Sequence, residues 1–348
     1  MPGIACSAPT DVKRAIVGLL ISGLAIYLAM RNVPLQDISL DRFPIDWRFV
    51  MLSCCGVIWS VVLRGYRLKR LLPQDDPVSR QLLSGSTAVL YMINNLVPAR
   101  AGEVARVVMI NRAGTSTAST IVTAVVVERM FDGIMLSAML LGAIFVADVD
   151  PWLERWFQGV GTVLGAGLLS VVALEWTHRR DPARADRWIS RVTGWFPARV
   201  GSVVQTQLSG VLGGLNLVGA PRRLAEVVVL SALIWIVTAT AFFTLGLGYS
   251  AGAMGGGWLI GPFSTGAVAV ASTVPAAPGF LGVFQVTVKE AMVLIGSQPA
   301  AAFHYANLLW IVNWITNNLL GIYYMIVLGI GVSDLKTAGR VDTHSSHS

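Results

Sequence analysis

Long apolar stretches separated by short charged connections make up most of this chain. A helix needs about 20 mostly apolar residues to cross a bilayer, and several stretches approach that length. The pattern therefore predicts an all-α polytopic membrane protein with about six to eight transmembrane helices, in a single integral membrane domain over residues 1–348. The predicted segments are 14–30, 47–63, 81–97, 117–147, 158–176, 225–247, 258–275, 279–296 and 304–331.

The charged connections orient these segments, because short loops rich in Lys and Arg face the cytoplasm. Basic residues cluster at 64–80 and 179–199, whereas acidic residues outnumber basic ones in the connections 31–46 and 148–157. This distribution places the N- and C-termini in the cytoplasm. It also predicts a cytoplasmic basic and interfacial segment at 177–200 and a disordered cytoplasmic tail at 333–348.

One short pattern occurs in both halves of the chain. Val97–Gly102 and Val274–Gly279 both read V-P-A-x-x-G inside apolar surroundings. Pro and Gly break helices, and matching breaks in two halves are typical of inverted repeats that bind their substrate at the breaks. Counting crossings between the oriented loops then predicts two inverted re-entrant hairpins, in pseudo-repeat halves of about 1–176 and 201–332. Two full crossings over 258–296 are the alternative.

Ionisable residues at the first break indicate a site for an anionic head group. Arg100, Glu103 and Arg106 follow the break at a spacing of three. A helix start attracts anions, and the planar fork of Arg fits phosphate oxygens. The alternative is that both arginines snorkel to the cytoplasmic interface. The predicted head-group-binding residues are Pro98, Arg100, Gly102, Glu103, Arg106, Pro275, Pro278 and Gly279.

A second group of charges lies inside the apolar segment 117–147. Glu128 is about 16 Å along a helix from Thr117, which is near the middle of a hydrocarbon core about 30 Å thick. Glu128 and Asp132 share a helix face, so one of them should pair with an arginine or stay protonated. We predict that Glu128, Arg129 and Asp132 support the arginines or carry a proton. The alternative is an internal ion pair that fixes helix packing.

Composition argues against several other classes of protein. Only 13% of residues are charged, whereas soluble domains have about 25%, and the net charge of +7 lies in loop clusters. We therefore expect no nucleic acid partner. The three cysteines and four histidines have no metal-site spacing, and nucleotide-loop and nucleophile-elbow motifs are absent. We expect no enzyme activity, no catalytic residue, no metal and no cofactor.

Two further groups of residues complete the sequence predictions. His304, with Tyr305 and Asn307, is the single loose candidate for the centre of a membrane-embedded transferase. Lys289 and Glu290 are expected to snorkel to a membrane interface.

Three of these motifs together resemble one protein family. Asn94–Arg106 resembles the N-x-x-x-P-A-R-x-G-E-x-x-R signature of the lysylphosphatidylglycerol synthase transmembrane-region family, which is also described as flippase-like. Glu128–Asp132 is similar to its E-R-x-x-D element. Pro275–Val283 is similar to its P-x-x-P-G-G-L-G-V element, with Phe280 in place of a Gly. The resemblance covers nearly the whole chain.

The resemblance implies a flippase-like protein of the bacterial cytoplasmic (inner) membrane. Such a protein moves an anionic lipid, which is a phospholipid, a polyprenyl phosphate or a glycolipid, so membrane lipids are the implied partners. The soluble aminoacyl-transferase domain of bifunctional relatives has no counterpart in these residues. The alternative is a non-catalytic membrane partner of a lipid-modifying glycosyl- or aminoacyl-transferase, docked on the basic segment. The sequence does not determine whether the protein forms a homo-oligomer, which lipid it binds, or the direction and energy source of transport.

Overall fold

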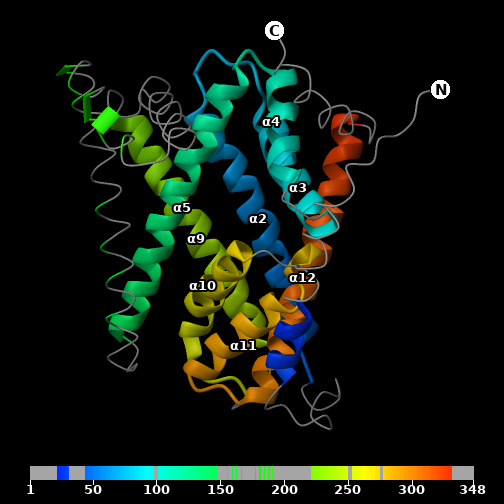
Figure 1. Ribbon diagram of the computed structural model, residues 1–348. Coiled ribbons are helices and arrows are strands. Elements are labelled where there is room, and N and C mark those ends of the chain that lie inside the picture. Colours follow the sequence, from blue (N-terminus) through cyan, green and yellow to red (C-terminus); the bar gives the residue numbers. More distant parts are fainter. Residues whose placement is uncertain are drawn as a thin grey trace, which may run out of the picture. The chain divides into compact units, whose positions relative to one another are not determined.

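The computed structural model describes residues 22–30, 44–97, 101–146, 221–249, 253–274 and 277–330, with isolated positions between 155 and 194. Every regular element in these ranges is a helix (Figure 1), and one isolated antiparallel bridge joins Ile45 to Tyr249. Within the described ranges, three helices are long and apolar enough to cross a membrane: α2 (Trp47–Leu71), α9 (Pro221–Leu247) and α12 (Pro299–Leu328). The all-helical prediction is confirmed for the described residues, and the total number of crossings stays a prediction.

The other helices follow the apolar segments of the sequence, and local capping residues explain several of their ends. At the start of α3, the backbone N–H of Leu82 donates to Ser79 Oγ at 3.1 Å, as expected for an N-cap serine. Pro221 and Pro299 open α9 and α12, where a missing N–H removes no helical hydrogen bond. These other elements are α3 (Arg80–Leu96), α4 (Ala101–Ala113), α5 (Ala118–Val146), η3 (Gly257–Leu259), α10 (Ile260–Thr273), η4 (Pro278–Phe280) and α11 (Val283–Leu294).

The predicted end of the second apolar segment, at residue 63, is wrong. Helix α2 continues to Leu71, so Arg64 and Arg67 lie inside the helix and are buried. The first arginines after the apolar segment do not end the helix, because buried carboxylates neutralise both guanidinium groups in the protein interior. The predicted segment 333–348 lies outside the described residues, and of the segments 158–176 and 177–200 only isolated positions are described.

The chain forms two compact units, each built from segments that are distant in sequence. Unit 1 consists of Met1–Trp59, Ala88–Glu103 and Val237–Val327, and unit 2 of Ser60–Thr87, Val104–Ile236 and Leu328–Ser348. Helices α2, α3, α4 and α9 each contribute one part to each unit. The predicted pseudo-repeat halves stay a prediction.

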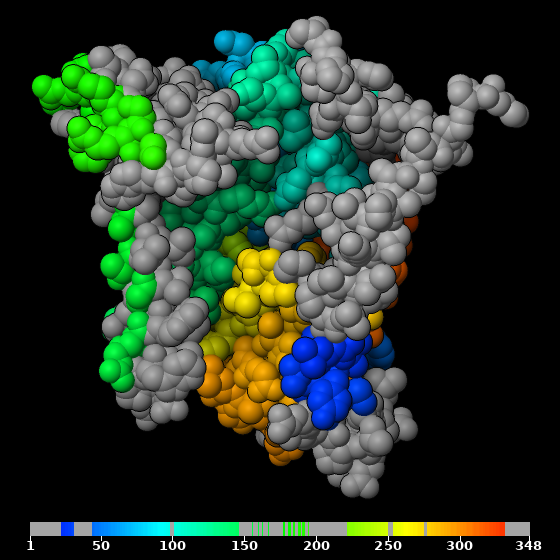
Figure 2. All heavy atoms as spheres, viewed as in Figure 1, coloured from blue at the N-terminus to red at the C-terminus, as the bar shows by residue number. Residues whose placement is uncertain are grey.

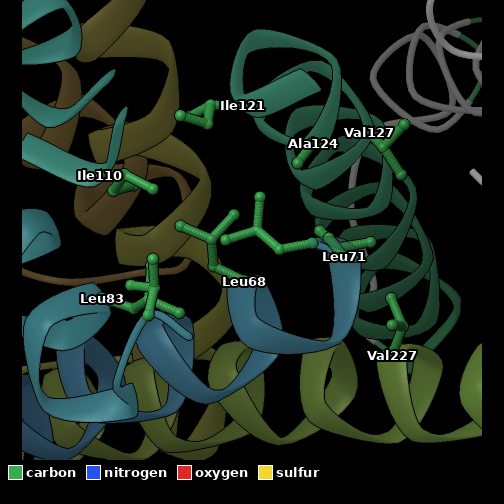
Figure 3. Close-up of a cluster of buried hydrophobic side chains, with 10 residues drawn as sticks. Leu68, Leu71, Leu83, Ile110, Ile121, Ala124, Val127 and Val227 are labelled. Atoms are coloured by element: carbon green, nitrogen blue, oxygen red, sulfur yellow. The ribbon is translucent and has the colours of Figure 1, made fainter. Parts of the chain in front are cut away.

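Aliphatic side chains from α2, α3, α4, α5 and α9 form the core of unit 2 (Figure 3). Close helix contact supports this core, because a Cβ at Gly65 would lie only 2.4 Å from Ser84 N. Small residues at such contacts let membrane helices approach closely. The buried core residues are Leu68, Leu71, Leu72, Val78, Leu83, Ile110, Ile121, Ala124, Val127 and Val227.

Each V-P-A-x-x-G pattern lies at the break between two helices. Helix α3 ends at Leu96 and α4 starts at Ala101, and a Cβ at Gly102 would lie 2.3 Å from the carbonyl oxygen of Leu90. The start of α4 therefore lies directly against α3. Helices α10 and α11 also pack against each other, and the chain between them carries the second pattern. Re-entry of these two hairpins into a membrane, and their inverted relation, stay predictions.

Asp76, in the connection between α2 and α3, joins two loops of unit 2. The residue is 2% exposed, and its carboxylate accepts the backbone N–H groups of Val78 and Ser116, each at 3.0 Å, and the Ser116 hydroxyl. Burial alone would raise its pKa. The hydrogen bonds, together with the charge of Lys69, outweigh burial and hold the pKa of Asp76 below its ordinary value of 3.8.

We expect Asp76→Asn to lower the free energy of unfolding at pH 7 by about 1.5–3 kcal/mol, the range for hydrogen bonds to charged groups. A carboxyl with a lowered folded-state pKa stabilises above its unfolded pKa, and this stabilisation is lost as pH falls through the folded pKa. The gap between variant and wild type should therefore close below about pH 4. Denaturant titration in detergent at several pH values measures it. Asp75→Asn, at the exposed neighbour, is the control. A gap of equal size at pH 7 and pH 3 would contradict this role.

Candidate functional site

A buried network of charges in unit 2 is centred on Arg67 of α2. Its side chain is fully buried. Nη1 donates to Asp132 Oδ1 at 2.7 Å and to Ser231 Oγ at 3.1 Å, and Nη2 donates to Glu128 Oε1 at 3.0 Å. One guanidinium therefore links α2 to both carboxylates of α5 and to a hydroxyl of α9. Arg suits this role because its planar fork carries five N–H donors.

Asp132 is held by two further side chains. Arg64 Nη1 lies 3.1 Å from Asp132 Oδ2, and Trp235 Nε1 donates to Asp132 Oδ1 at 3.1 Å. The guanidinium of Arg64 also lies over the Trp235 ring, 5.3 Å from its centroid, in a cation–π arrangement. Arg129 is more distant, with Nη1 3.9 Å from Asp132 Oδ2, and its side chain is 45% exposed.

Arg106 of α4 enters the network from the opposite end. Its Nη2 lies 3.0 Å from Glu128 Oε2 and donates to Thr87 Oγ1 at 3.1 Å. Glu128 thus lies between two arginines, Arg67 and Arg106. Because the Arg106 side chain is 1% exposed, the alternative that it snorkels to an interface is wrong.

The network has more positive than negative charge. Among the five buried side chains Arg64, Arg67, Arg106, Glu128 and Asp132, three guanidinium groups face two carboxylates, which is an excess of one positive charge within this group. Arg67 Nε and Arg106 Nε are buried and have no hydrogen-bond partner among the described residues. Buried charges and donors without partners are costly, and an anion with oxygen acceptors would satisfy both. The arrangement is therefore suited chemically to binding a phosphate.

The other predicted residues of the first break are described only in part. Pro98 and Arg100 lie outside the described residues. Gly102 is buried, and its N–H donates to Asn94 Oδ1 at 3.0 Å, which joins the start of α4 to the end of α3. Glu103 is half-buried on the first turn of α4.

Two tryptophans of α12 hold the second break in unit 1. Trp310 Nε1 donates to the carbonyl oxygen of Gly279 at 2.7 Å, and the Trp310 ring stacks on Trp314. A Cβ at Gly279 would lie 3.6 Å from the carbonyl oxygen of Asn95, at the end of α3. The two breaks therefore meet in unit 1. Pro278 opens η4 beside Gly279 and is exposed, whereas Pro275 lies outside the described residues.

The helical residues 22–30 lie against the second break (Figure 2, blue beside orange). Ser22 Oγ accepts the N–H of Ala277 at 3.0 Å, and a Cβ at Gly282 would lie 2.4 Å from the Ser22 carbonyl oxygen. Phe280, which stands where the family pattern has Gly, has a φ of 57°. Only Gly adopts this left-handed conformation without cost, so the backbone at Phe280 is strained.

Two of the three residues considered for a transferase, His304 and Tyr305, make buried hydrogen bonds in unit 1, whereas Asn307 Nδ2 donates to the carbonyl oxygen of Phe303 in its own helix. Tyr249 Oη and His304 Nδ1 are 2.9 Å apart. Tyr305 Oη donates to the carbonyl oxygen of Phe242 at 2.8 Å and lies 3.0 Å from Ser264 Oγ. No group of three or more His, Cys, Asp or Glu side chains suited to a metal occurs within the described ranges.

Sequence reasoning missed five members of the charge network: Arg64, Arg67, Thr87, Ser231 and Trp235. A signal for the two arginines was present. Arg64 and Arg67 are three residues apart, so they share a helix face, and the two carboxylates of the apolar segment 117–147 require cationic partners. No comparable signal marks Thr87, Ser231 or Trp235, because single Thr, Ser and Trp residues are common in membrane helices.

Comparisons with known proteins agree with the helical structure and the motifs. A search of curated proteins returned no match. Residues 15–321 match the family described as the lysylphosphatidylglycerol synthase TM region. The match covers most of the chain and concerns the transmembrane region of that family, not its catalytic domain. The chain is thus an integral membrane protein with helical spans, and it belongs to the lysylphosphatidylglycerol synthase TM-region family.

Proposed function

We propose that this protein is a flippase-like transporter that moves an anionic lipid across the bacterial cytoplasmic membrane. The candidate lipids are a phospholipid, a polyprenyl phosphate or a glycolipid. The observation that carries the proposal is the buried network of Arg64, Arg67, Arg106, Glu128 and Asp132, with its excess positive charge. A purely structural ion network has no need of a net charge, whereas a site for a phosphate does.

In the proposed mechanism, Arg106 binds the phosphate and the rest of the network holds Arg106 in position. Arg67 fixes Glu128, and Glu128 in turn pairs with Arg106, so an arriving phosphate replaces the Glu128 contact of Arg106. Within unit 2, Arg129 and Asp132 support Arg106. Within unit 1, we propose separate head-group contacts at Arg100, Glu103 and the two breaks, with the residues Pro98, Gly102, Pro275, Pro278 and Gly279.

The proposed transport uses the two hairpins as inverted re-entrant repeats. Their breaks, which meet at Asn95 and Gly279, bring backbone polar groups to one place, as in transporters that bind substrate at interrupted helices. The acyl chains stay in the bilayer while the head group passes. Both termini are placed in the cytoplasm by the positive-inside rule, and the protein itself is not an enzyme.

We expect Arg106→Gln to slow lipid translocation roughly tenfold to a hundredfold, because it removes charge-assisted hydrogen bonds worth about 1.5–3 kcal/mol. The measurement is translocation of labelled phosphatidylglycerol and polyprenyl phosphate in proteoliposomes. Arg112→Gln, on the exposed end of the same helix, is the matched control and should keep the wild-type rate. A folded Arg106→Gln protein that transports at the wild-type rate would refute the role of this network.

The family description supports a second candidate, a non-catalytic membrane partner of a lipid-modifying transferase. The basic segment that includes the exposed side chains of Arg184, Arg187 and Arg191 would be its docking surface. Under this alternative, the folded protein moves none of the lipids in proteoliposomes. A transferase then co-purifies with the wild type and is lost when these three arginines are changed to Gln.

A further inference from the structure

A second buried cation lies in unit 1, and it does not belong to the charge network of unit 2. Lys289 of α11 is 2% exposed, so the expectation that it snorkels to an interface is wrong. A buried ammonium costs several kcal/mol unless charges and hydrogen bonds compensate it, and a Lys inside a membrane protein usually marks a functional site.

The compensation of Lys289 within the described residues is weak. Its ion pair is with the adjacent Glu290, at 3.3 Å from Nζ to Oε1, and the Glu290 side chain is 58% exposed. An ammonium carries three donors, and one water-exposed carboxylate does not enclose it. The ammonium group of Lys289 is therefore only partly neutralised by Glu290. This environment is more typical of an anion-binding site than of a buried structural ion pair.

Other polar groups lie on the same face of α11. Gln285, 4% exposed, is one turn before Lys289, and its Oε1 accepts the N–H of Gly282 at the second break at 2.7 Å. Met292 is about one turn after Lys289 and contacts Ser264 Oγ. Gln285 and Lys289 are thus two polar side chains on one face of α11, with Lys289 about 10 Å along the helix from Gly282.

We propose that Lys289 binds the phosphate group of a lipid as a second anion site, with the NH₂ group of Gln285 as a further donor. The inference rests on the proposed function in naming a lipid, but the site itself is built only from residues of unit 1. The phosphate oxygens accept hydrogen bonds from the ammonium of Lys289 and the NH₂ group of Gln285. The bound anion also neutralises Lys289 more fully than the exposed carboxylate of Glu290 does.

The test measures binding stoichiometry with full-length protein in phosphatidylcholine nanodiscs. Dioctanoyl phosphatidylglycerol and inorganic phosphate are titrated separately and followed by native mass spectrometry. We expect two equivalents of phosphatidylglycerol on the wild type, one on Lys289→Met and two on Lys289→Arg. The affinity of the lost site should fall at least roughly tenfold. Binding of inorganic phosphate alone would identify a free anion as the ligand and refute the lipid assignment.

Two further variants separate this site from a structural ion pair and from the proposed function. Glu290→Gln should leave lipid binding intact or tighten it, because it removes the competing carboxylate. If the Lys289–Glu290 pair is only structural, Glu290→Gln and Lys289→Met will weaken folding and binding alike. Arg106→Gln should remove the other equivalent. Two equivalents on folded Lys289→Met would overturn the Lys289 site alone, and two on Arg106→Gln would overturn the unit 2 site alone.

Discussion

Arg67→Met is expected to lower the free energy of unfolding by about 3–5 kcal/mol, the range for breaking a buried ion pair from one side. The substitution removes the hydrogen bonds to Glu128, Asp132 and Ser231 together, and it leaves carboxylate oxygens buried without their partner. Met has a similar length and an apolar side chain, so lost packing contributes little. Reversible unfolding in bicelles, or the thermal midpoint in detergent, measures the effect.

Arg129→Met is the matched control for this prediction. Arg129 is also an arginine beside Asp132, but the atoms are 3.9 Å apart and the side chain is 45% exposed. Exposed pairs of this kind contribute at most about 1 kcal/mol. If Arg67→Met and Arg129→Met had equal small effects, Arg67 would not be the centre of the network, and the positioning role given to it would be wrong.

Gly282→Ala is expected to destabilise the second break by about 2–5 kcal/mol. The residue has a φ of 87°, and an L side chain in such a conformation costs about 1–2 kcal/mol. The added Cβ would also lie 2.4 Å from the carbonyl oxygen of Ser22. This overlap with backbone adds about 1–3 kcal/mol, because residues 22–30 must move away from the break.

Gly296→Ala separates these two contributions. Gly296 has a φ of 91°, but no atom lies within 4 Å of an added Cβ, so only the conformational cost applies. We expect its thermal midpoint to fall by clearly less than that of Gly282→Ala. In addition, Gly282→Ala should increase the accessibility of Cys labels placed in residues 22–30. Equal shifts for the two variants would show that contact with the Ser22 backbone does not hold the break.

Much of the helical architecture could be predicted from local sequence. Apolar length predicted α9 and α12 to within a few residues, and the Pro and Gly residues of the V-P-A-x-x-G patterns predicted the breaks after α3 and α10. Glu128 and Asp132 could be identified as special, because ionisable residues in an apolar segment need a partner or a cavity. These inferences succeed because hydrophobic periodicity and backbone restrictions act over a few neighbouring residues.

The burial of charged side chains, and the residues with which they form ion pairs, could not be predicted in the same way. Arg64 and Arg67 look like a cytoplasmic loop in sequence, and Lys289 looks like an interfacial residue, yet all three are buried. Whether Arg64 and Arg67 end a helix or lie inside it depends on which carboxylates face them, and those carboxylates belong to α5, more than 60 residues away in the chain. Sequence patterns report the local preference of a segment, whereas the free energy of a buried charge depends on groups that only the folded chain brings together.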